Sequence, residues 1–126
     1  MRSDAAHWNR LVLGVAAAVE AVTGLALIVF PQLLIRLLFG AEVTGAGIVI
    51  GRVAGIALLS LGVGCRLGRQ ETSGGWALVA MLLYNVLVTL YLAVVGIGGE
   101  FVGVLLWPAV GLHAVLTALL CYAWPR

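Results

Sequence analysis

The sequence predicts an all-helical integral membrane protein, a single domain (residues 1–126) in which four transmembrane helices form an antiparallel bundle. Composition is the first observation. Of the 126 residues, 63% are hydrophobic and 10% are charged, whereas a soluble domain carries about 25% charged residues. The second observation is four apolar runs, each long enough to cross the hydrocarbon core of a bilayer, which is about 30 Å thick. The third is an uneven distribution of arginine between the connecting segments, which sets the orientation.

The first span is predicted at residues 11–30, an apolar run that ends at Pro31, which cannot continue the helical hydrogen-bond ladder. Glu20 lies near the middle of this run. Its neighbours on the same helical face are small, so we expect the carboxylate to face the packed interior of the bundle. These small neighbours are Ala16, Ala17, Thr23 and Gly24.

Residues 32–39 form a second apolar run that contains one charge, Arg36. The run is too short to cross a bilayer, and its composition is typical of a helix lying in the membrane interface. We therefore expect a short interfacial helix between the first two spans, followed by a turn at residues 40–45.

The second span is predicted at residues 47–65, where glycine recurs on one helical face. Because each residue turns the helix by about 100°, these glycines fall in a narrow stripe. Such a stripe lets a neighbouring backbone come close, so we expect this face to pack against another helix. The helix-packing glycines are Gly47, Gly51, Gly55 and Gly62. Arg52 lies beside them inside the span, where a lone guanidinium is costly and needs a partner.

The third and fourth spans are predicted at residues 76–95 and 101–123. Asn85 lies near the middle of the third span, and His113 lies near the middle of the fourth. Pro108 falls in the outer part of the fourth span, where we expect it to kink the helix or to leave a backbone carbonyl free.

Arginine placement predicts the orientation of the bundle. The connection between the second and third spans and the two chain ends carry most of the arginines, whereas the opposite side carries only Arg36. Basic residues concentrate on the cytoplasmic side. We therefore expect a multi-pass protein of a bacterial inner membrane with both termini in the cytoplasm. The cytoplasmic arginines are Arg2, Arg10, Arg66, Arg69 and Arg126.

The four polar residues inside the spans are expected to converge. A rise of about 1.5 Å per residue puts Glu20, Asn85 and His113 near the bilayer midplane, with Arg52 within reach of Glu20. We predict that these four form a buried polar cluster, a structural network in which Glu20 and Arg52 are an ion pair that fixes the packing partners of each helix. The alternatives are a proton or substrate site, since a buried carboxylate beside a histidine is suited to titration near neutral pH, and a cofactor or ligand site.

Three stretches resemble known families. Residues 18–24, Ala-Val-Glu-Ala-Val-Thr-Gly, are similar to the first helix of the small multidrug resistance transporters, which implies proton coupling through Glu20. Ala109-Val-Gly-Leu-His113 followed by Trp124 resembles the Ala-xxx-His…Trp pattern of bacterial light-harvesting polypeptides, which implies a tetrapyrrole ligand at His113. Residues 52–62 and 84–85 look like those of a group of small, uncharacterised four-helix bacterial membrane proteins, and this implies an architecture without an activity.

The function predicted from the sequence is non-enzymatic. The sequence offers no catalytic residues, because it has no serine beside a histidine and an acid and no phosphate loop, and it has no metal-ligand spacing of Cys and His. A net charge of +2 is too small to indicate nucleic-acid binding. The leading prediction is an accessory or assembly subunit that contacts lipid and other transmembrane helices in a larger complex or a homo-oligomer. The alternatives are a small proton-coupled transporter using Glu20 and a tetrapyrrole-binding subunit using His113; no other cofactor is expected.

Overall fold

The computed structural model describes residues 2–68 and 75–124, which contain helices and no strand. The helices are α1 (Arg2–Val29), α2 (Pro31–Phe39), α3 (Ala46–Gly68), α4 (Gly75–Gly98) and α5 (Leu106–Tyr122). The all-helical prediction is therefore confirmed. Three of these helices are long and apolar enough to cross a membrane, namely α1 from Ala6 onward, α3 and α4, whereas α5 is apolar but shorter. Arg69 and Arg126, which enter the orientation argument, lie outside the described residues.

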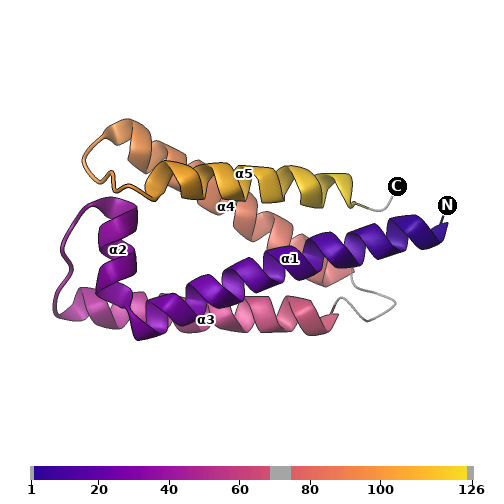
Figure 1. The fold of residues 1–126 in the computed structure, drawn as a ribbon, viewed down its shortest axis with the longest axis horizontal. Coiled ribbons are helices and arrows are strands. Elements are labelled where there is room, and N and C mark those ends of the chain that lie inside the picture. Colours follow the sequence, from indigo (N-terminus) through magenta and orange to yellow (C-terminus); the bar gives the residue numbers. More distant parts are fainter. Residues whose placement is uncertain (1, 69–74, 125–126) are drawn as a thin grey trace.

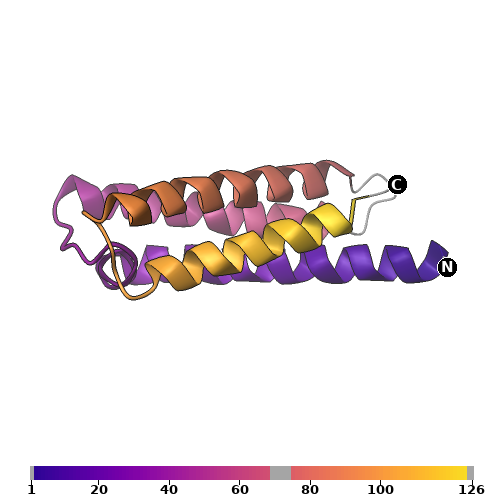
Figure 2. The same ribbon diagram turned by 90° about the horizontal axis from the view of Figure 1, so that it is seen from above.

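Figure 1 shows α1, α3, α4 and α5 running lengthwise along the molecule, with α2 across one end. The closest packing is within two pairs, α1 with α3 and α4 with α5. The two pairs approach one another near the end that holds both chain termini, and they separate toward the end where α2 lies (Figures 1 and 2). The buried apolar core follows this shape, because its largest members, such as Leu13, Met81, Leu116 and Leu120, come from the half nearer the termini.

Glycine brings α1 and α3 into close contact. A Cβ atom built on Gly55 would lie 2.6 Å from the backbone oxygen of Gly24, and one built on Gly62 would lie 2.8 Å from the backbone nitrogen of Ala21. At both positions, therefore, only hydrogen lets the neighbouring backbone come this close. Gly51 is also buried, but it lies against Pro31 and Ile35 at the start of α2.

Gly47 has a different environment from the rest of the predicted stripe. The side chain of Val43, in the segment that precedes α3, lies directly against the position of a Gly47 Cβ atom, and no other helix comes within 4 Å of that position. Gly47 is the second residue of α3, so it lies at the end where the helix pairs have already separated. The prediction that it packs against another helix is corrected on this point.

The fourth predicted span begins later than expected, at Leu106 instead of Phe101. The preceding segment is held by α2: the backbone N–H of Gly103 donates to Leu38 O at 2.9 Å, and that of Leu105 donates to Leu37 O at 2.9 Å. The last carbonyls of a helix lack partners within the helix, so this segment satisfies two of them.

Pro108 does not kink a helix, contrary to the prediction. Because α5 starts at Leu106, Pro108 is the third residue of its first turn. Backbone N–H groups in the first turn have no carbonyl partner within the helix, and the missing N–H of proline therefore costs nothing there.

Candidate functional site

Three of the four predicted polar residues come together inside the molecule. Glu20 of α1 and Asn85 of α4 are completely buried, and His113 of α5 is 8% exposed. The Nδ1 atom of His113 lies 2.9 Å from Asn85 Oδ1 and 3.6 Å from Glu20 Oε1. Side chains from α1 and α4 thus meet at one imidazole nitrogen of α5.

Arg52 does not join this cluster, and it forms no ion pair with Glu20; its side chain is exposed on α3. Gly51 and Gly55 turn one face of α3 toward the interior, and the next residue after Gly51 is rotated by about 100° from that face. The predicted pairing of Glu20 with Arg52 is therefore replaced by the contact between Glu20 and His113.

The hydrogen bonds around Asn85 determine that Nδ1 of the histidine ring carries a hydrogen. Asn85 Nδ2 donates to the Met81 carbonyl oxygen at 2.9 Å, so its Oδ1 atom is the one that faces His113. An amide oxygen only accepts, and the Nδ1 atom of His113 must therefore carry the hydrogen. Tyr84 adds an edge-on aromatic contact to the same ring, with the ring centroids 6.0 Å apart and the planes at 78°.

Glu20 is the unusual member of the cluster. Both of its carboxylate oxygens are fully buried, and no described residue meets hydrogen-bond distance and angle limits with either of them, although the Tyr84 hydroxyl lies close enough to interact with the carboxyl group. The contact to His113 is beyond hydrogen-bond distance at 3.6 Å. An ionised carboxylate buried without a donor is costly. The arrangement therefore favours a carboxyl group that either keeps its proton or shares one with His113.

An apolar cavity of about 490 Å³ lies between the two helix pairs. All five helices contribute to its wall, for example through Leu27 of α1, Leu38 of α2, Leu58 of α3, Val88 of α4 and Leu112 of α5. The polar lining residues Thr23, Tyr84 and His113 are those that lie nearest the terminal end on α1, α4 and α5. The cavity is thus apolar along its length and polar at its inner end.

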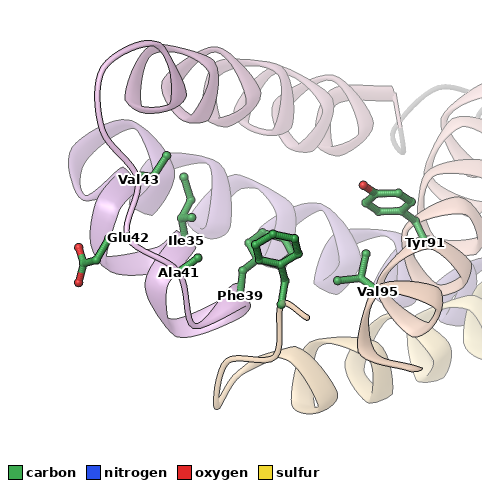
Figure 3. A pocket seen from close by; sticks show the side chains of 8 residues that line it. Ile35, Phe39, Ala41, Glu42, Val43, Tyr91 and Val95 are labelled. Carbon is green, nitrogen blue, oxygen red and sulfur yellow. The ribbon is translucent and has the colours of Figure 1, made fainter. Parts of the chain in front are cut away.

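The cavity reaches the outside of the bundle along α3. Ile50 lines it and is also 68% exposed. A second, smaller cavity of about 350 Å³ adjoins it and shares Ile35 and Phe39 of α2. In this smaller cavity Tyr91 and Val95 of α4 face the α2 side chains, whereas Glu42 points away (Figure 3). Glu42 instead pairs with Arg36 at 3.2 Å on the exposed surface.

Sequence reasoning found the polar residues but missed Tyr84 and the cavity. Tyr84 directly precedes Asn85, and nothing in the apolar run predicted that its ring would lie beside His113. The cavity depends on how far the helix pairs separate, and no local sequence pattern predicts that distance. Comparisons with protein-family models, with curated proteins and with solved structures gave no significant match.

Proposed function

We propose that the protein is a non-enzymatic, multi-pass membrane protein that binds an amphiphilic small molecule from the bilayer in the cavity between its two helix pairs. The observation that carries this proposal is the cavity itself, which is apolar along its length and ends at Tyr84 and His113. A long apolar wall with a few polar groups at one end is typical of sites for molecules that have a hydrocarbon tail and a small head group.

The membrane arrangement that we propose is an antiparallel bundle of four spans, α1, α3, α4 and α5, with α2 in the outer interface. At about 1.5 Å per residue, the 17 residues of α5 cover about 26 Å, slightly less than a hydrocarbon core. Both chain ends lie at the same end of the molecule (Figure 1), which agrees with cytoplasmic termini and an even number of spans. A bacterial inner membrane is the location that the arginine placement favours.

The size of the cavity limits the size of its occupant. A cavity of 150 Å³ accepts benzene, so the volume of about 490 Å³ accommodates a molecule of about 20 non-hydrogen atoms. Entry from the lipid phase along α3 is consistent with the exposure of Ile50 and Ala54, both of which line the cavity.

The test compares two tryptophan substitutions on α5. Ala109 lines the cavity, whereas Ala114 is exposed and does not. Native mass spectrometry of the protein extracted from its membrane should show an additional bound mass for wild type and Ala114→Trp. Ala109→Trp should lose this mass because the indole fills the cavity. Equal retention in both variants would show that the cavity is not the binding site.

An accessory or assembly subunit is the second candidate function, and the exposed Arg52 favours it. A guanidinium that faces outward within a membrane span needs a partner. A carboxylate on a helix of another protein would supply one. Mild-detergent extraction should then give a large complex that Arg52→Gln disrupts. An unchanged particle size would mean that the Arg52 side chain instead extends to the interface.

Two predictions from the sequence remain to be tested by the same preparation. Absorbance of the extracted protein reports whether a tetrapyrrole is bound at His113. Proton-driven flux in liposomes, and its loss in Glu20→Gln, reports whether Glu20 couples transport to protons.

A further inference from the structure

The hydrogen-bonding of His113 limits which head groups the ligand can carry, provided that the cavity is the binding site proposed above. We infer that the ligand carries an uncharged hydroxyl or carbonyl head group, which forms a hydrogen bond with Nε2 of His113 at the inner end of the cavity. Asn85 and Glu20 act as positioning residues: they keep a hydrogen on Nδ1 of His113, so that Nε2 is left for the ligand.

The two ring nitrogens of His113 have different surroundings. Nδ1 is committed to Asn85 Oδ1 at 2.9 Å, with Glu20 Oε1 beside it at 3.6 Å. Among the described residues the His113 side chain forms its hydrogen bond through Nδ1 and none through Nε2, and His113 lines the cavity. Nε2 is therefore the ring nitrogen left for a ligand, and it accepts a hydrogen bond when the ring is neutral.

The described residues at the inner end of the cavity offer no charged group to a ligand. In addition to the hydrogen on Nδ1, Glu20 and His113 can share one proton. The pair is then neutral overall, whether the carboxyl group or Nε2 carries that proton. No Lys or Arg among the described residues lines the cavity, so an anionic head group would find no counter-charge. Glu20 itself is completely buried and does not line the cavity, so a cationic head group could not reach the carboxylate directly. An uncharged head group avoids both costs.

The direction of the hydrogen bond at Nε2 depends on which group holds the proton. With the proton on Glu20, Nε2 accepts from a hydroxyl group; with the proton on His113, Nε2–H donates to a carbonyl or hydroxyl oxygen. Tyr84 and Thr23 add hydroxyl groups at the same end of the cavity. The inner end is thus suited to a head group that exchanges hydrogen bonds, not to one that carries a charge.

The experiment uses the full chain in lipid nanodiscs and a photoactivatable analogue of hexadecan-1-ol. The competitors are hexadecan-1-ol, hexadecylammonium and hexadecanoate, each of which has fewer than the roughly 20 non-hydrogen atoms that the cavity volume accommodates. The alcohol should compete best, with the two ions at least about tenfold weaker. His113→Leu should weaken alcohol binding about two- to thirteenfold, the equivalent of one hydrogen bond. Equal competition by all three probes, or full affinity in His113→Leu, would overturn the inference.

Two further measurements separate failure of this inference from failure of the proposed function. Cross-linking that persists in Ala109→Trp would count against the cavity as the binding site. Cross-linking that Ala109→Trp abolishes, but that the alcohol and the two ions inhibit equally, would count against the head-group inference alone. Nitrogen-15 spectra of histidine-labelled protein, with His7→Gln for assignment, should show hydrogen on Nδ1 of His113, whether or not Nε2 also carries one. Asn85→Leu should populate the other tautomer. A wild-type ring with its hydrogen on Nε2 alone would also overturn the inference.

Discussion

Replacing Gly55 with leucine should separate α1 from α3 and destabilise the protein. A Cβ atom at Gly55 would lie 2.6 Å from Gly24 O and 2.9 Å from Ile28 N, whereas ordinary contacts begin at 3.4 Å. The first added carbon alone therefore requires the backbones to move apart by about 0.8 Å, and leucine adds three more carbons. Overpacking of this kind costs about 1–3 kcal/mol.

Gly64→Leu is the matched control for this prediction. Gly64 lies on the same helix, is exposed, and has nothing within 4 Å of its Cβ position. Both variants gain the same side chain and the same change in helix propensity, so the difference between them isolates the contact with α1. The free energy of unfolding, measured by titrating mixed micelles with sodium dodecyl sulfate, should fall by about 1–3 kcal/mol more for Gly55→Leu. Equal values for the two variants would refute the close approach of α1 and α3.

Two other predictions follow from the arrangement of the chain. Reporter tags at the two termini should both indicate the cytoplasm, and a periplasmic signal from either would contradict the proposed four spans. Because Arg52 faces outward and Glu20 does not contact it, the destabilising effects of Glu20→Gln and Arg52→Gln should add within about 0.5 kcal/mol, whereas Glu20→Gln and His113→Gln should not be additive. A large coupling between Glu20 and Arg52 in this double-mutant cycle would bring back the ion pair predicted from the sequence.

The features that were predicted correctly from the sequence depend on residues that are close together in the chain. The short helix at Pro31–Phe39 follows from an apolar run that proline opens and Gly40 ends with a φ of 68°. The burial of Glu20 follows from small residues on its own face, such as Ala16 and Ala17, which are also buried. Both patterns act within one or two helical turns and need no knowledge of the rest of the fold.

The features that it missed depend on contacts between distant segments. Residues 101–105 are as apolar as a helix, but Gly103 and Leu105 bond to α2, and no periodicity records that pairing. The direction of Arg52 depends on which flank of the glycine stripe borders the cavity. Ile50 and Ala54 line the cavity on one flank. At about 100° per residue, Arg52 falls on the other flank, away from Glu20.

The separation of the helix pairs follows from the length of α2. Pro31 ends α1, and α2 then crosses toward the start of α5 (Figure 1). Its last turn is fixed there by the hydrogen bonds from Gly103 and Leu105. Nine residues at about 1.5 Å each cover about 13 Å, more than the 8–10 Å that separates the axes of packed helices. The helix pairs therefore cannot close at this end, whereas glycine and alanine let α1 and α3 remain in contact. The space that α2 holds open is the cavity, and the polar cluster lies where the two pairs converge and close it.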